Sequence, residues 1–340
     1  MVRPVLDRVR MKITVLGAGS WGTTVASLVA RRHPTMIWAR DPVVADEIRL
    51  NRRNPRYLSE YLLPARLDAT DDLSKAVGQA ELLIVGVPSH AFRDTLKAAR
   101  PFVHPWIPVV SLTKGLEQGT LLRMTQLIKE ELPGHPAAAL TGPNIAREIM
   151  EGNAAASVIA SEDLEVAGAL QRTLQRGLLR LYTNHDVIGC ELGGALKNVI
   201  AIASGIAEGL EVGDNTRAAV MTRGLAEFTR LGVAMGGEQS TLSGLAGMGD
   251  LVVTCISPHS RNRSVGEQLG RGRSLDEVLG GMTMVAEGVK AAIAVHDLAA
   301  RLGLEMPVCD TIYDVVTGKI AAADAYRGLR RPAGRESDPG

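Results

Sequence analysis

A lysine surrounded by small and apolar residues is the first position in this sequence where chemistry is expected. Lys197 lies in the stretch 191–200, and on a helix its neighbours three or four residues away include Gly193, Gly194 and Ala201. A lone lysine on such a helix often only extends its ammonium to water. The small neighbours, however, leave room for a ligand or for another backbone. A partly buried lysine can have its pKa lowered towards neutrality and act as a general acid or base.

Two polar side chains could assist this lysine. Asn198 follows it directly and offers both a hydrogen-bond donor and an acceptor. Asp250 ends the glycine-rich stretch 244–249 and opens a short apolar run. Its carboxylate could orient a lysine ammonium or accept a hydrogen bond from a substrate hydroxyl, but it could equally cap the element that follows. The residues alone leave these two interpretations equal.

A second group of residues offers donors that suit a phosphate. Ser260, Arg261 and Asn262 present a hydroxyl, a guanidinium and an amide in succession. Arginine forms charge-assisted, forked hydrogen bonds to phosphate oxygens. Basic loops are often simply solvated, and without other support this interpretation is as good as a phosphate site.

Three more residues follow apolar strands directly. Lys114 comes after one such strand, and Gly142 and Asn144 come after another. These residues are therefore expected at the carboxyl edge of a parallel sheet, where ligands bind in open α/β folds.

The first glycine-rich turn has the spacing of a dinucleotide-binding motif. Gly17, Gly19 and Gly22, with Ser20 and Trp21 between them, follow an apolar strand and open a helix. The first glycine permits a tight turn, the second lets a pyrophosphate approach the backbone, and the third lets helix and strand pack closely. The free N–H groups of the first helical turn would then point at the phosphates. A glycine-rich turn without a ligand is the less favoured alternative.

The end of the second strand bears on the choice of cofactor. An acidic residue there usually holds the ribose 2′-hydroxyl of NAD, whereas an arginine accommodates the 2′-phosphate of NADP. Arg40 stands at this position and Asp41 follows it. Arg40 favours NADP, and NAD is left open by Asp41. Arg40 could also be a solvated cation, and Asp41 before Pro42 fits a helix cap so well that capping is its main assignment.

Hydrophobic patterning separates the chain into two halves. Short apolar runs alternate with helical periodicity in the first half, which predicts a parallel sheet with crossover helices. Strands are expected at 12–16, 36–39, 82–87, 109–112, 138–140, 155–160 and 178–182, and helices at 21–32, 42–50, 121–131 and 164–175. From about residue 187 the strand signals disappear, and helices are expected at 187–208, 216–231, 264–269, 285–302 and 307–317.

These patterns predict the fold class α/β, with a Rossmann-type doubly wound sheet domain followed by an all-helical C-terminal domain. The boundary is placed near Asp186, so that 11–186 form an NAD(P)-binding domain and 187–326 a substrate-binding domain. A ligand crevice between two such domains would be ordinary. Residues 1–10 and 327–340 are expected to be disordered, and either Met1 or Met11 could be the true start.

Composition excludes several other classes of protein. A formal net charge of +1 and 3% aromatic residues argue against a nucleic-acid partner. Cys190, Cys255 and Cys309 have no metal-like spacing, so no metal is expected and a reducing, cytoplasmic compartment is the simplest interpretation. Cys190 and Cys255 are expected in the core. No signal-peptide pattern begins the chain, and no apolar stretch is expected to insert stably in a membrane.

Taken together, the motifs resemble those of the bacterial NAD(P)-dependent sn-glycerol-3-phosphate dehydrogenase family. The resemblance covers roughly 12–307 and runs in family order through 17–23, 87–89, 113–115, 142–144, 193–198, 222–224, 244–251, 260–263 and 287–289. It implies reversible reduction of dihydroxyacetone phosphate to sn-glycerol 3-phosphate for phospholipid synthesis. It also leaves open a homodimer. Two departures concern only fine contacts: Ser59 follows Tyr57-Leu58 where proline is common, and Asn144 stands where serine or threonine is also common.

The resemblance also implies site roles. Lys197 matches the proton donor or acceptor, and in the proposed mechanism Asp250 holds it or a hydroxyl in place. The substrate would be lined by Lys114, Gly142, Asn144, Lys197, Asn198, Asp250, Ser260, Arg261 and Asn262. The cofactor would be lined by Gly17, Gly19, Ser20, Trp21, Gly22, Arg40, Lys114, Ala146, Arg261, Val285 and Glu287.

Two other functions are weighed against this one. Another two-domain dehydrogenase could act on a 3-hydroxy acid or on 6-phosphogluconate, and a panel of substrates would separate it. A non-enzymatic NADP-binding regulator is disfavoured because Lys197, Asn198 and Asp250 are all retained.

Overall fold

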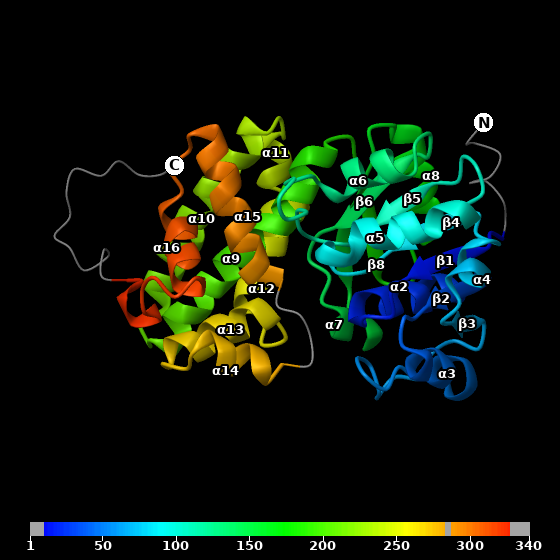
Figure 1. Ribbon diagram of the computed structural model, residues 1–340, viewed down its shortest axis with the longest axis horizontal. Helices are drawn as coiled ribbons and strands as arrows, with labels where there is room; N and C mark the ends of the chain where they lie inside the picture. Colours follow the sequence, from blue (N-terminus) through cyan, green and yellow to red (C-terminus); the bar gives the residue numbers. More distant parts are fainter. Residues whose placement is uncertain (1–9, 283–286, 327–340) are drawn as a thin grey trace. The chain divides into compact units, whose positions relative to one another are not determined.

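The computed structural model describes residues 10–282 and 287–326, which form two compact units, each with its own core (Figure 1). The sheet unit comprises 10–114 and 122–187, and the helical unit comprises 115–121 and 188–326. The segments expected to be disordered lie outside the described residues, apart from Arg10, and so does Val285. Residues 115–121 were placed with the sheet from the sequence, and this is wrong: Leu116 and Leu121 pack in the core of the helical unit.

The sheet unit is built on eight strands in the order β3-β2-β1-β4-β5-β6-β7-β8. All neighbouring pairs are parallel except the antiparallel pair β6 and β7. The order reverses between β1 and β4, which is the switch point where open α/β sheets bind ligands. The strands are β1 (Ile13–Leu16), β2 (Thr35–Trp38), β3 (Leu67–Thr70), β4 (Leu82–Val85), β5 (Val109–Ser111), β6 (Ala137–Thr141), β7 (Ala155–Ala160) and β8 (Leu179–Asn184).

Helices cover both faces of this sheet because its strands are apolar on both sides. Ile13 and Val15 of β1 pack into one core cluster, while Leu16 packs into the other. The first cluster takes side chains from α2 (Ser20–Ala30), α3 (Pro42–Asn51), α7 (Ala146–Met150) and α8 (Leu164–Leu174). The second takes them from α4 (Leu73–Val77), α5 (Ser89–Ala99) and α6 (Met124–Glu131), and the short 3₁₀ turn Arg100–Phe102 follows α5. Doubly wound packing of this kind confirms the predicted fold class.

The helical unit has no strand among its described residues. Its elements are α9 (Val187–Gly209, whose first residue belongs to the sheet unit), α10 (Asp214–Ala234), α11 (Gln239–Leu242), the π-helical turn η2 (Leu245–Gly249), α12 (Asp250–Ile256), α13 (Arg261–Gly270), α14 (Leu275–Gly280), α15 (Glu287–Leu302), α16 (Pro307–Val316) and the 3₁₀ turn Ala322–Asp324.

Helix α9 is the central helix of this unit, and Leu196, Ile200 and Ile206 on it are fully buried. By length and composition it could cross a membrane, contrary to the expectation from the sequence. However, 94% of its most apolar 18-residue window is buried inside the protein. A helix that is apolar on all sides fits the core of a globular unit equally well.

Glycines let α13 pack closely against α9. A Cβ at Gly205 would lie 2.0 Å from the carbonyl oxygen of Arg263, and one at Gly209 would lie 2.2 Å from that of Glu267. Gly266 and Gly270 face α9 in the same way. Both helices thus carry glycines four residues apart, a spacing that allows close backbone approach. The small residues near Lys197 were expected to admit either a backbone or a ligand, and at Gly193 and Gly205 they admit a backbone.

Several elements differ from the sequence-based expectation. Strand β3 and helices α4 and α5 were not predicted. The first two are too short for a clear periodicity, whereas α5 is amphipathic, with Phe92, Leu96 and Ala99 buried, and was overlooked. Residues 250–256 were read as an apolar run of undecided type, and they form helix α12. Helix α6 begins at Met124, after the segment 115–121 has packed into the helical unit.

Candidate functional site

The glycine loop after β1 has a distinct backbone requirement at each glycine. Gly17 has φ +108°, and a Cβ there would lie 2.8 Å from the carbonyl oxygen of Gly86. A Cβ at Gly22 would lie 2.1 Å from the carbonyl oxygen of Gly17. A Cβ at Gly19, in contrast, would meet nothing within 4 Å. The first and third glycines are thus needed by the fold, whereas the second leaves an open approach to the backbone.

Helix α2 begins at this loop without a side-chain cap. Its N-cap is Gly19, which makes no side-chain hydrogen bond, so the N–H groups of the first turn are suited to an anion. The indole Nε1 of Trp21, on the same turn, is buried and has no hydrogen-bond partner among the described residues. A buried donor in that state is where a ligand acceptor or an ordered water is expected. This arrangement fits a dinucleotide pyrophosphate.

Asn54 braces the glycine loop from a distant part of the chain. Its Nδ2 donates to the carbonyl oxygen of Ala18 at 2.9 Å and to Oγ1 of Thr23 at 2.8 Å. Its Oδ1 accepts from the backbone N–H groups of Arg56 and Tyr57 at 3.2 and 3.3 Å. Asn54 is fully buried. The sequence analysis did not single it out, because the partners of its Nδ2 lie more than 30 residues away and no local pattern indicates them.

The end of β2 presents Arg40 and engages Asp41. Oδ1 of Asp41 accepts from the N–H of Val43 at 3.0 Å and so caps α3, which confirms its main assignment. Its Oδ2 lies 3.8 Å from Nη1 of Arg56. Arg40 is exposed and lies two residues after Trp38, the last residue of β2. With its carboxylate thus occupied, Asp41 is poorly placed to serve a ribose hydroxyl as well.

Lys114, Gly142 and Asn144 lie together at the carboxyl edge of the sheet, as predicted. Nζ of Lys114 donates to the carbonyl oxygen of Gly142 at 3.0 Å and to Oδ1 of Asn144 at 2.8 Å. Gly142 has φ +120°, and a Cβ there would lie 3.1 Å from Cα of Ser157. Nδ2 of Asn144 is buried and has no partner within the described parts of the chain. An ammonium beside an unpaired amide donor fits a ligand with oxygen acceptors.

The helical unit holds a second cluster, centred on Lys197. Its Nζ donates to Oδ1 of Asp250 at 2.5 Å and to Oγ1 of Thr254 at 2.8 Å. The Lys197 side chain is 8% exposed and that of Asp250 is 1% exposed. The N-cap of α12 is Gly249 and it makes no side-chain cap bond. Of the two interpretations left equal for Asp250, the structure therefore supports orientation of the lysine.

Thr254 is a second residue that the sequence analysis missed. Its Oγ1 donates to the carbonyl oxygen of Asp250 at 2.6 Å and accepts from Lys197. Threonine commonly bonds the carbonyl four residues earlier in a helix, so this hydroxyl is held with its acceptor side towards the ammonium. The four-residue spacing between Asp250 and Thr254 is present in the sequence, but it indicates a contact only once residues 250–256 are known to form a helix.

An amide chain lies beside the lysine. Nδ2 of Asn262 donates to Oδ1 of Asn198 at 2.9 Å, and Oδ1 of Asn262 accepts from the N–H of Gly288 at 2.9 Å. Ser260 is the N-cap of α13, and its Oγ accepts from the N–H of Arg263 at 3.3 Å. The structure therefore brings Asn198 close to Asn262 and to the start of α13 at Ser260, although Asn198 lies more than 60 residues earlier in the sequence.

The remaining predicted residues lie at the starts of helices. Ala146 begins α7, Arg261 begins α13 and Glu287 begins α15, whereas Val285 lies outside the described residues. Cys190 and Cys255 are buried, which confirms their assignment to the core. Burial raises the pKa of the Cys255 thiol to about 12, so this thiol is a poor nucleophile although it neighbours the lysine cluster.

Comparison with known proteins shows the family. Residues 12–167 match the model of the N-terminal region of NAD-dependent glycerol-3-phosphate dehydrogenases, and residues 186–327 match that of the C-terminal region. The chain belongs to the glycerol-3-phosphate dehydrogenase family. Among its relatives is glycerol-3-phosphate dehydrogenase [NAD(P)+] 2 of Sphingopyxis alaskensis, 54% identical over 97% of this chain and 100% of that protein.

Other members of the glycerol-3-phosphate dehydrogenase family give the same picture. Glycerol-3-phosphate dehydrogenase [NAD(P)+] 1 of Mycobacterium tuberculosis is 53% identical over 94% of each chain. The crystal structure of glycerol-3-phosphate dehydrogenase from Coxiella burnetii matches with a TM-score of 0.92 at 36% identity, over 95% of this chain and 100% of that one. These matches confirm the resemblance drawn from the motifs.

Proposed function

We propose that this protein reduces dihydroxyacetone phosphate reversibly to sn-glycerol 3-phosphate with NAD(P)H, with Lys197 as the proton donor. The observation that carries the proposal is the buried Lys197 ammonium, held by Asp250 and Thr254. An ammonium has three N–H donors, and these two acceptors occupy two of them. The third can serve the oxygen that becomes an alkoxide when hydride reaches the ketone carbon.

The cofactor would be held mainly by the sheet unit, and it supplies the hydride. Gly17, Gly19 and Gly22 shape the loop that receives the pyrophosphate, with the first turn of α2 and its Trp21 indole as donors. Exposed Arg40 favours NADP through the 2′-phosphate, because the neighbouring carboxylate of Asp41 is occupied by the helix cap. Further contacts are expected from Ser20, Lys114, Ala146, Arg261, Val285 and Glu287.

The phosphate of the substrate would be held by Ser260, Arg261 and Asn262. The other polar groups of the substrate would be held by Lys114, Gly142, Asn144 and Asn198. The start of α13 supports this assignment, since a helix N-terminus favours an anion. Asp250 orients the ammonium of Lys197. Binding of the remote phosphate would place the ketone carbon correctly and so contribute to the rate.

Substitution of Lys197 tests the proposal. Lys197→Ala should lower kcat with dihydroxyacetone phosphate by about three orders of magnitude, since general acid catalysis contributes 10²–10⁴-fold. NADPH should still bind, as measured by its fluorescence. Lys129→Ala is the matched control, because this lysine forms an exposed ion pair with Glu162. Near-normal turnover by the Lys197 variant would remove the residue from the proposed role.

Assembly and setting are also proposals. We infer a cytoplasmic enzyme of phospholipid synthesis without stable membrane insertion, since the apolar helix α9 is buried. A homodimer is compatible with exposed apolar side chains on the helical unit, at Met248, Val252 and Ile256. Light scattering during size-exclusion chromatography would decide between a monomer and a dimer, and fractionation would decide the compartment.

A further inference from the structure

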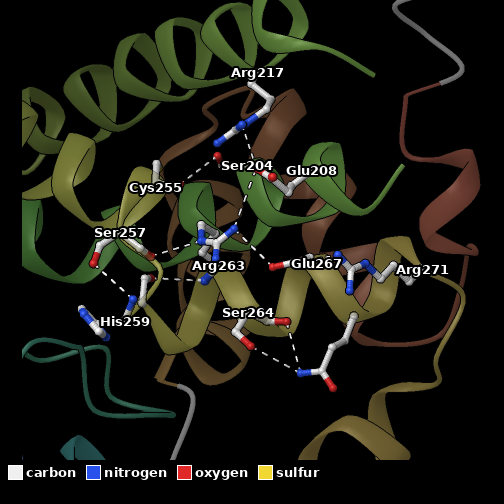
Figure 2. A network of polar contacts seen from close by, with 12 residues as sticks. Ser204, Glu208, Arg217, Cys255, Ser257, His259, Arg263, Ser264, Glu267 and Arg271 are labelled. Carbon is white, nitrogen blue, oxygen red and sulfur yellow. Dashed lines mark hydrogen bonds and ion pairs between the residues drawn. The ribbon is translucent and has the colours of Figure 1, made fainter. Parts of the chain in front are cut away.

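Arg263 hydrogen-bonds to both ends of the turn, residues 257–260, that precedes α13 (Figure 2). Nε of Arg263 donates to the carbonyl oxygen of Ser257 at 3.1 Å, and its backbone N–H donates to Oγ of Ser260 at 3.3 Å. Within the turn, Oγ of Ser257 accepts from the N–H of His259 at 3.2 Å. The path of the backbone into Ser260 and the residues after it therefore depends on Arg263.

The same guanidinium is held by two carboxylates. Nη1 of Arg263 lies 3.2 Å from Oε2 of Glu267 and 3.8 Å from Oε2 of Glu208. These acids have partners of their own: Glu208 pairs with Arg217 at 2.7 Å, and Glu267 pairs with Arg271 at 2.6 Å. Figure 2 shows the contacts of Arg263 with both acids as dashed lines. Its side chain is only 12% exposed, so the fork of donors is kept in one orientation.

Arg263 is also fixed by its backbone to the helix that carries the lysine. Its carbonyl oxygen would lie 2.0 Å from a Cβ at Gly205 of α9, so only glycine permits this contact. One residue earlier, Asn262 donates to Asn198 at 2.9 Å, and Asn198 directly follows Lys197. The start of α13 and the lysine are therefore parts of one packed arrangement within the helical unit.

We propose that Arg263 is a positioning residue for the phosphate of the substrate: it holds Ser260, Arg261 and Asn262 in place and fixes their spacing from Lys197. This inference rests on the proposed function, since it takes those three residues as the phosphate site. In this proposal Arg263 acts through the turn and not by touching the substrate, since its Nε and Nη1 are directed to Ser257 and Glu267. Its contribution is the shape of the turn.

Removal of the Arg263 side chain should be tolerated by the fold. Glu208 keeps Arg217 and Glu267 keeps Arg271, so neither carboxylate is left as an unpaired buried charge. The carbonyl oxygen of Ser257 loses the Nε donor, which frees the turn to move. A purely structural role would instead lower all activities together as the folded fraction falls.

Steady-state kinetics of Arg263→Gln, with Arg271→Gln as the matched control, test the proposal. Arg271 pairs with the same Glu267 but is 65% exposed. Arg263→Gln should lower kcat/KM for dihydroxyacetone phosphate about tenfold or more, chiefly through KM, with a smaller change in KM for NADPH because Arg261 is only one of the expected cofactor contacts. The kcat/KM of Arg263→Lys for dihydroxyacetone phosphate should fall between those of wild type and Arg263→Gln, because one ammonium cannot replace both arms of the guanidinium. Arg271→Gln should behave like wild type.

A ketone without phosphate provides the second readout. The kcat/KM for unphosphorylated dihydroxyacetone should change by less than about twofold in Arg263→Gln, since no phosphate site is used. Equal losses on both ketones, an effect on kcat alone, or equal effects of Arg263→Gln and Arg271→Gln would overturn the inference. Absence of turnover of dihydroxyacetone phosphate by the wild-type protein would instead contradict the proposed function, so the two failures are distinguishable.

Discussion

Glycine serves opposite purposes in the two units. In the loop after β1 of the sheet unit, Gly19 leaves open space where a side chain would otherwise stand. In the helical unit, Gly205 leaves no space at all, because the backbone of Arg263 fills it. Open space at the first glycine suits the proposed approach of a ligand, whereas the second glycine is required by the packing of α9 against α13. A glycine in a motif does not by itself reveal which of these roles it has.

The polar groups near the proposed ligand sites of the two units also differ, in whether they have partners within the protein. In the sheet unit, Trp21 and Asn144 each keep a buried donor without a partner among the described residues. In the helical unit, the polar groups around Lys197 bond to one another, from Asp250 to Thr254. Under the proposed function, the unpaired donors of the sheet unit would receive acceptors from a large ligand, whereas the helical unit orients a single ammonium in advance.

The largest expected effect is on stability, at the helix contact. Gly205→Ala should lower the free energy of unfolding by about 3 kcal/mol, because the methyl group would meet three backbone atoms of α13 that cannot move independently. Thermal or denaturant unfolding would measure it. A change below about 0.5 kcal/mol would mean that α9 and α13 can separate at little cost. Gly205 would then no longer differ from Gly19 in its importance for packing.

Asn54→Ala should act on both stability and cofactor binding. The carbonyl oxygen of Ala18 would lose its buried donor, at a cost of about 2 kcal/mol, and the glycine loop would no longer be held. We expect KM for NADPH to rise while KM for dihydroxyacetone phosphate stays near wild type. Asn51→Ala is the control, since this exposed residue bonds through its side chain to Glu47 and not to the glycine loop in the described contacts. Loss of stability with unchanged cofactor binding would limit Asn54 to a structural role.

Gly19→Ala should show the reverse of Gly205→Ala. The backbone at this position has φ −73°, which alanine adopts readily. The free energy of unfolding should therefore change by less than about 1 kcal/mol. The methyl group would stand in the approach of the pyrophosphate, and NADPH affinity should fall about tenfold, or 1.4 kcal/mol. Titration calorimetry with NADPH would measure this. Unchanged affinity would show that the phosphates do not approach the loop at Gly19.

The smallest effect concerns acid sensitivity of the sheet unit. Burial, with Arg176 and Arg32 nearby, lowers the pKa of His33 from 6.5 to about 4, and its Nδ1 accepts from the N–H of Met11 at 3.1 Å. The folded state thus disfavours the charged imidazole. The contribution of His33 to the free energy of unfolding is therefore fully present above pH 6.5 and is lost as the pH falls towards 4. The loss should reach about 1 kcal/mol at pH 6. In His33→Gln the free energy of unfolding should depend less on pH in this window, and an unchanged dependence would exclude His33 as its source.

Local spacing explains what could be predicted from the sequence. Gly17, Gly19 and Gly22 are defined by their positions between one strand and one helix, and the structure places them as expected. Lys114, Gly142 and Asn144 were expected at one edge because parallel strands end on the same side of a sheet, and their hydrogen bonds confirm it. Roles for these residues in binding remain proposals.

What the sequence determined by itself was the alternation of strands and helices, the glycine loop and a lysine among small residues, because each of these depends on neighbours within a few positions. Only the tertiary structure decided that Asp250 faces Lys197, that Asn54 braces the loop at Ala18 and that residues 115–121 join the helical unit. These contacts link positions far apart in the chain, and such pairs are selected by the packing of whole elements, which no local pattern encodes.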